Sequence, residues 1–197
     1  MAEALITRQH QKDDAASVAV YSACERYRYR LTRVWSAGPQ VVFVLLNPST
    51  ATELQNDPTV ERCERRARAL GFGSFAVANI FAIRATDPRV MRAAADPVGP
   101  GNDLAILAMV AQAARIVCGW GSHGAHLGRG AAVEALLRGT GRDLYQLGLT
   151  LAGAPKHPLY IGYGRQPELW AQGGSDFARN LRAGTICDVG TAALPSA

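Results

Sequence analysis

Unbroken apolar runs are the strongest feature of the hydrophobic pattern along this chain. Residues 41–46 form one run, and residues 75–83 form a second that is interrupted only by Asn79. Continuous apolar runs are typical of strands that are buried on both faces, as in a parallel sheet. Residues 115–120 and 144–149 predict two further strands.

The segments between these strands carry helix signals. Asp57 precedes a proline and an apolar stripe at helical spacing, which predicts a helix that begins there. Asp87 is expected to begin a short helix in the same way, Asn102 to cap a third, and residues 130–138 to form a fourth. Strands that alternate with helices predict right-handed crossovers, and hence an α/β fold with a mostly parallel four-stranded sheet.

The region before the first buried strand has a different pattern. Residues 26–35 alternate, with Arg26, Arg28 and Arg30 on one side and apolar residues on the other. Period two predicts a half-buried strand with an arginine face, paired with residues 18–21 in an N-terminal hairpin. This face is either solvated or a contact for nucleic acid.

Three segments follow from these patterns. Residues 1–16 are polar and are predicted to be frayed, and residues 17–170 are predicted to form a single α/β domain. After Trp170 the chain turns to Gly, Ser, Ala and Thr, so we expect residues 171–197 to be a weakly ordered tail.

Composition narrows the class of protein. The longest unbroken run of large apolar residues, at 41–46, has six residues, whereas a membrane helix needs about 20. The four cysteines lack paired spacing, which argues against a disulfide framework and a zinc site. No secretory signal is visible, so we expect a cytoplasmic protein, and no cofactor or metal is predicted. The net charge of +5 fits a phosphate-bearing partner.

Polar residues lie where the predicted strands end. Asn47 follows the first strand, Asn79 lies in the second and is followed by Arg84 and Asp87, and His157 follows the fourth. Ligands of open α/β sheets bind beyond the carboxyl ends of the strands, so this convergence predicts a ligand site. The first strand leads into neither a Walker loop nor GxGxxG, which argues against those phosphate sites.

Two resemblances rest on these motifs. LNPSTA at 46–51, DPT at 57–59, RATDP at 84–88 and KHPL at 156–159 resemble an uncharacterised bacterial family of domains of unknown function. The order Asn-Pro, a strand Asn, Trp-Gly-Ser and His-Pro more distantly resembles the uracil-DNA glycosylase superfamily. That resemblance implies a three-layer sandwich and an enzyme that hydrolyses the N-glycosidic bond of a nucleobase in DNA or in a free nucleotide.

The glycosylase resemblance also implies roles for individual residues. Asn47 would orient the attacking water, Asn79 would bind the Watson–Crick edge of the base, and His157 would stabilise charge on the departing base. Leu159 would enter the base stack if the substrate is DNA. We further expect Phe81 or Tyr160 to stack on the base.

Several polar residues leave other hypotheses open. An Asn amide cannot act as a base, so Asp57 or Asp87 is the candidate general base, although both also fit helix caps. Ser49 stands where the glycosylases screen the base, and Arg84 would hold a phosphate or sugar. A second hypothesis is a non-catalytic module that binds a nucleotide or nucleic acid. A third is a hydrolase of another bond that uses Asp57 or Asp87.

Overall fold

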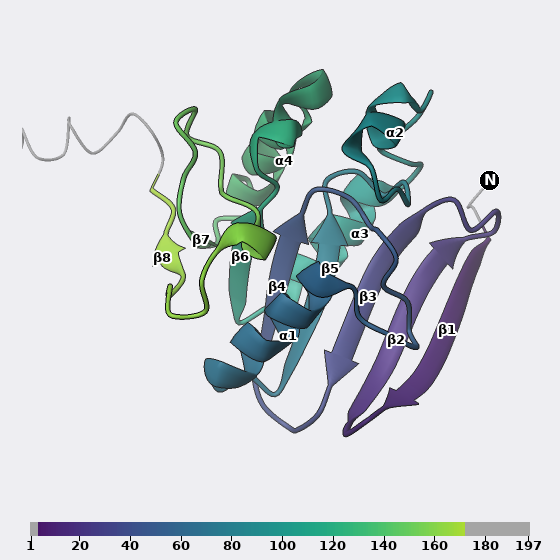
Figure 1. Cartoon of the computed structure of the whole chain (residues 1–197), viewed down its shortest axis with the longest axis vertical. Coiled ribbons are helices and arrows are strands. Elements are labelled where there is room, and N and C mark those ends of the chain that lie inside the picture. The colour runs from purple at the N-terminus through teal and green to yellow at the C-terminus, as the bar shows by residue number, and fades with distance from the viewer. Residues whose placement is uncertain (1–3, 172–197) are drawn as a thin grey trace, which may run out of the picture.

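The computed structural model describes residues 4–171, which form one open sheet with helices on both faces (Figure 1). The strands are β1 (Leu5–Lys12), β2 (Ala15–Ser22), β3 (Arg28–Val34), β4 (Gln40–Leu45), β5 (Ser74–Asn79), β6 (Arg115–Gly119), β7 (Leu144–Gln146) and β8 (Glu168–Leu169). The helices are α1 (Pro58–Ala69), α2 (Pro88–Ala93), α3 (Asn102–Ala111), α4 (Arg129–Arg138) and the 3-10 helices η1 (Ser122–Gly128) and η2 (Pro158–Tyr160). Within these residues, no helix has the length and apolar character needed to cross a bilayer.

The sheet is mixed and has the order β1-β2-β3-β5-β4-β6-β7-β8. β5, β4, β6 and β7 run parallel, whereas β1, β2, β3 and β8 form antiparallel pairs at the two ends. The α/β class is therefore confirmed. A sheet of four strands was too small a prediction, because β3 pairs with β5 from Leu31↔Val77 to Val34↔Ser74 and joins the N-terminal strands to the rest.

The N-terminal segment corrects a second expectation. Residues 5–12 were predicted to be frayed, but they form β1 and pair with β2 along their whole length. A polar sequence suits this position, because β1 is the edge strand and its side chains are mostly exposed. The β2–β3 hairpin that the alternation predicted is confirmed. The predicted tail at 171–197 lies outside the described residues, except for Ala171.

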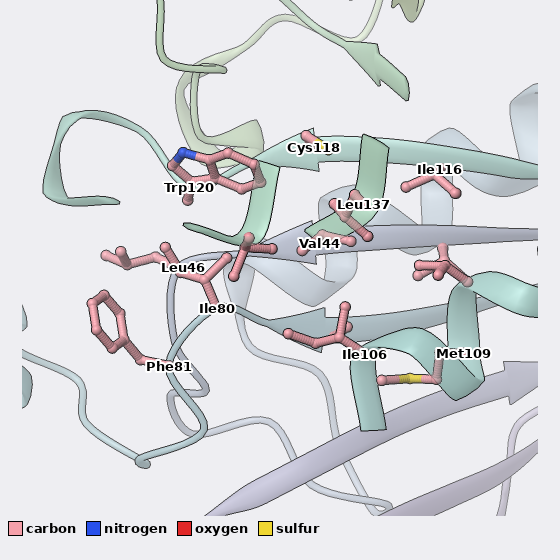
Figure 2. Close-up of a cluster of buried hydrophobic side chains, with 14 of the residues drawn as sticks. Val44, Leu46, Ile80, Phe81, Ile106, Met109, Ile116, Cys118, Trp120 and Leu137 are labelled. Carbon is pink, nitrogen blue, oxygen red and sulfur yellow. The ribbon is translucent and has the colours of Figure 1, made fainter. Parts of the chain in front are cut away.

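Two apolar clusters cover the two faces of the parallel strands. Val41 and Phe43 of β4 pack on the face of α1, whereas Val42 and Val44 pack with α3 and α4 on the opposite face. Figure 2 shows the second cluster, in which Val44 lies among side chains of β6, α3 and α4. Burial on both faces is what the continuous apolar run of β4 predicts.

A β-bulge in β3 overturns the predicted arginine face. Val20 pairs with Arg30 and Tyr21 pairs with Arg28, so Tyr29 is an extra residue and the alternation changes phase there. Arg28 is consequently buried on the face of α1, whereas Arg26 and Arg30 are exposed. The three arginines therefore do not share one exposed face.

Candidate functional site

The connections to and from β5 leave the sheet on opposite faces. α1 connects β4 to β5 on one face, and α3 connects β5 to β6 on the other. In open α/β sheets, ligands bind at such a switch point, beyond the carboxyl ends of the strands. Leu45 of β4 pairs with Asn79 on one side and with Gly119 on the other, so residues after these positions meet at one edge. We call Asn47, Asn79 and His157 the carboxyl-edge site.

Asn79 is the most informative residue of this site. It is the last residue of β5 and is 3% exposed. Its carbonyl oxygen accepts a hydrogen bond from Asn102 Nδ2 at 3.0 Å, but its side-chain amide makes no hydrogen bond to any of residues 4–171. The amide atoms of Asn79 are not among the fully buried atoms that lack a partner, so they keep contact with solvent at the edge of the sheet. The amide is therefore available to a ligand.

The side chain of Asn47 is oriented by main-chain carbonyls. Its Nδ2 donates to Ala85 O at 2.7 Å and to Pro48 O at 2.9 Å. Ala85 N also donates to Pro48 O at 2.9 Å, which ties the segment after β5 to the loop after β4. Because both neighbours of Nδ2 are acceptors, Oδ1 must point the other way. Within the described chain Oδ1 has no partner, so it can accept a hydrogen bond from water or from a ligand N–H.

Two glycines allow His157 to approach the sheet. A Cβ on Gly119 would lie 2.9 Å from Pro158 Cδ and 3.2 Å from Lys156 O, so only glycine permits this contact. Gly121 has a φ of +66°, a conformation that favours glycine, and a Cβ there would lie 3.7 Å from His157 Cβ. The sequence thus places His157 beyond the end of β6.

His157 is neutral at physiological pH. Burial lowers the pKa of its imidazole to about 4, which outweighs the opposing effect of the Asp57 carboxylate, and His123 lowers this pKa further. Its Nδ1 is buried and has no hydrogen-bond partner in residues 4–171. A neutral imidazole has one N–H donor and one acceptor nitrogen, so it can donate to an oxygen without carrying charge into the site.

Asp57 is a structural residue in this arrangement. Its Oδ1 accepts hydrogen bonds from Thr59 N at 2.9 Å and Val60 N at 2.8 Å, and its Oδ2 accepts from Ala51 N at 3.3 Å. These contacts cap α1 and fix the loop before it. Both oxygens of the predicted general base are engaged.

The other predicted polar residues lie around the site and do not meet in it. Asp87 caps α2 through Arg89 N at 2.7 Å, and its ion pair with Arg89 lowers the pKa of its carboxyl. Arg84 points toward the β2–β3 hairpin, where it donates to Glu25 O at 3.3 Å and lies 5.3 Å from the ring centroid of Tyr21. Ser49 is half-buried in the loop after β4.

The residues predicted to stack on the base or to enter the base stack lie in different environments. Phe81 is fully buried in the cluster on the α3 face, near Leu46 and Ile80, so its ring cannot stack on a base beside Asn79 (Figure 2). Leu159 is half-buried in η2. Tyr160 is 82% exposed, and its ring centroid lies 6.2 Å from that of His157.

Comparison with protein families adds one finding. Residues 28–159 match the family described as "Protein of unknown function (DUF1643)". The chain belongs to this family. The DUF1643 match spans all three residues of the carboxyl-edge site and most of the sheet. No curated protein and no solved structure matches the chain.

The DUF1643 region contains two buried arginines whose role the sequence did not reveal. Arg28 Nη1 donates to Ala51 O at 2.6 Å, and Arg33 Nη2 donates to Thr52 O at 2.6 Å. Together they hold the β4–α1 loop across the N-terminal strands, and so position Asp57. The bulge in β3 concealed them, because strict alternation does not place Arg28 and Arg33 on one face.

Asn102 is a second residue of the DUF1643 region whose role differs from the prediction. It was expected to cap α3, but the cap position is Gly101, and Asn102 is buried in the first turn. Its Nδ2 donates to the carbonyls of Asn79 and Ile80, which fixes the end of β5.

The site offers little to a metal ion. Within residues 4–171, no three His, Cys, Asp or Glu side chains lie close enough together to form a metal site. The polar groups of the carboxyl-edge site are two amides and one imidazole, which suit hydrogen bonds to a neutral, planar ligand better than coordination of a hard cation.

Proposed function

We propose that the carboxyl-edge site binds a nucleobase and that the protein hydrolyses an N-glycosidic bond. The observation that carries this proposal is the amide of Asn79, which ends an almost fully buried residue, reaches solvent and makes no hydrogen bond to the described residues. An amide presents a donor and an acceptor side by side, which complements the edge of a base. Enzymes that act on bases read them by hydrogen bonds of this kind.

The other two residues supply the chemistry that such a cleavage needs. Breaking the bond leaves negative charge on the base and positive charge on the sugar. A donor held in place near the base lowers the barrier, and neutral His157 can be that donor. Asn47 Oδ1 can hold the water that attacks the sugar carbon. Leu45 pairs with Asn79 on one side and with Gly119 on the other, and His157 approaches the chain beyond β6, so both groups lie at the same edge of the sheet.

One observation favours a second candidate, a module that binds a nucleobase without cleaving it. Asp57 and Asp87 are both engaged as helix caps, so neither of the predicted general bases has a free role. The same contacts leave the third hypothesis, a hydrolase of another bond, without an available carboxylate at this site.

A glycosylase assay distinguishes these possibilities. The full chain would be incubated with single- and double-stranded oligonucleotides that carry uracil, hypoxanthine, xanthine or an alkylated base, and alkali would reveal abasic sites. We expect Asn79→Ala and His157→Ala to reduce cleavage by about 100-fold each. His10→Ala, which removes an exposed histidine of β1, is the matched control and should cleave like the native chain.

Binding without cleavage would support the second candidate, provided that Asn79→Ala abolishes it. A steep loss of affinity with increasing salt would identify DNA as the partner. A shallow loss of affinity would identify a free nucleotide as the partner. If no base, nucleotide or oligonucleotide binds, or if Asn79→Ala binds as well as the native chain, the proposal is wrong.

A further inference from the structure

A groove lies on the face of the sheet opposite Asn79. α3 packs on β3, β4 and β5, whereas β1 and β2 extend beyond it (Figure 1). The exposed face of β1, β2 and β3 and the side of α3 thus form two walls. The groove between them has a volume of about 920 Å³, near the upper end of the range for small-molecule sites. We call it the α3 groove, and its lining includes Leu5, Val20, Arg30, Thr32, Leu104 and Ala108.

The α3 groove is lined by more apolar than polar residues, and its polar residues are Thr7, Tyr29, Arg30, Thr32, Gln40 and Gln112. Leu104 of α3 is 73% exposed and Leu5 of β1 is 56% exposed, and they line the groove from opposite walls. Between them, Ala105 and Ala108 keep the surface of α3 shallow. An exposed apolar surface with this shape is typical of a ligand groove.

A single charge lies in this apolar lining. Arg30 is the only charged residue among the described residues that line the groove. Unlike Arg28 and Arg33, which donate to protein oxygens, Arg30 has no ion pair or hydrogen bond within residues 4–171. An unpaired guanidinium is the preferred partner of a carboxylate, which it can bind through two parallel hydrogen bonds.

A second polar group supports a ligand at this position. Thr32 lies two residues after Arg30 in β3 and also lines the groove. It is 8% exposed, and its buried Oγ1 has no hydrogen-bond partner in the part of the chain that the structure describes. The buried Thr32 hydroxyl and the solvent-exposed Arg30 guanidinium are therefore both available to a ligand in the groove.

We propose that the α3 groove binds a small amphipathic monocarboxylate, with its carboxylate on Arg30 and its hydrocarbon chain between α3 and the sheet. One cation in the lining balances one negative charge, which favours a monocarboxylate over a nucleotide. The apolar walls on both sides favour a hydrocarbon chain over a sugar. This site is separate from the carboxyl-edge site, since Asn79 faces α1 and the groove faces α3.

Calorimetry with sodium decanoate, kept below its micelle concentration, tests this proposal on the full chain. We expect saturable binding of one decanoate per chain. Arg30→Gln should weaken it about tenfold, because it removes the charge that pairs with the carboxylate. Decan-1-ol, which has the same chain and no charge, should bind about tenfold more weakly than decanoate. Arg26→Gln is the matched control, because Arg26 is exposed but does not line the groove.

Two further variants test the position of the hydrocarbon chain. Ala108→Phe should block the groove and Leu104→Gln should weaken binding, and both positions are exposed, so the fold should tolerate them. Absence of saturable decanoate binding would overturn the proposal. Equal affinity of the native chain for decanoate and decan-1-ol would also overturn it, as would equal affinity of the native chain and Arg30→Gln for decanoate. If sedimentation shows a dimer that does not bind decanoate, the proposal is wrong and the groove is covered by a second copy of the chain.

Discussion

The two halves of the sheet bury different chemistry. In the parallel half, β4 places Phe43 in one apolar cluster and Val44 in the other, and both faces are closed by hydrocarbon. In the antiparallel half, β2 and β3 bury Tyr21, Arg28 and Arg33 beneath the β4–α1 loop. The first half is an apolar core, and the second adds directional hydrogen bonds to the apolar packing of Ala19 and Leu31.

This difference explains how the site loop is held. Arg33 donates to Thr52 O, and Tyr21 OH donates to the Glu53 carboxylate at 2.9 Å. Hydrogen bonds of buried groups fix position more narrowly than apolar contacts, because a small shift leaves a polar atom unsatisfied. The antiparallel half therefore holds in place the loop that connects Asn47 to Asp57.

The largest effect should come from the apolar half. Phe43→Ala should lower the free energy of unfolding by roughly 3–5 kcal/mol, because it removes a fully buried ring and leaves a cavity. Urea unfolding measures this loss. Tyr160→Ala, at an exposed aromatic position, should change stability by less than about 0.5 kcal/mol. A loss below about 1 kcal/mol for Phe43→Ala would contradict the assignment of this core.

A smaller effect is expected in the polar half. Arg33→Met should cost about 2 kcal/mol, because it leaves Ser17 Oγ, Thr52 O and Asn56 Oδ1 without their donor. Arg30→Met is the matched control on the same strand and should be nearly neutral. If the two variants are equally stable in urea, the hydrogen bonds of Arg33 do not hold the loop.

Removing the cap of α1 should have a smaller effect again. Asp57→Ala should cost about 1 kcal/mol, the typical value for a lost N-cap. Asp87→Ala should cost less, because Asp87 is more exposed and caps a helix of only six residues. Thermal unfolding of the two variants compares them directly, and the reverse order would contradict the role given to Asp57.

A slope with pH is an effect of another kind, because it comes from the titration of one group and not from a lost contact. The pKa of His157 is about 4 in the folded chain and near 6.5 when unfolded. Between these values the unfolded chain binds the extra proton, so stability should fall as pH drops from 6.5 to 4. His157→Gln should flatten this slope, and His10→Gln should leave it unchanged. NMR titration of the imidazole that gives a pKa near 6.5 would contradict the burial of His157.

The parallel half was predictable because its residues obey one simple pattern. The apolar runs around Val41 and Phe75 are typical of strands buried on both faces, and Asp57-Pro58 is a typical start of a helix, so both were placed correctly. The edge position of Asn79 followed from the same pattern. The sequence could not predict that the Asn79 side-chain amide lacks a partner, because hydrogen bonds depend on neighbours far away in the sequence.

The antiparallel half was harder to predict for an equally physical reason. A bulge at Tyr29 changes the phase of alternation, which buries Arg28, and no local signal marks it. Pairing with β2 orders a polar β1 that has no apolar pattern of its own. Phe81 was misplaced because the chain leaves the strand after Asn79 and turns that ring into the core on the α3 face.

The most direct test of the central claim is NMR observation of the Asn79 side-chain amide. Its two proton resonances can be assigned by their loss in Asn79→Asp, and the native chain can then be titrated with uracil, hypoxanthine, xanthine and adenine. The account predicts that at least one base shifts these resonances in a saturable way, while the side-chain amide of Asn56, which already donates to Glu64 at 2.7 Å, stays unchanged. If no base moves the Asn79 resonances, this amide does not read a nucleobase and the proposed function fails.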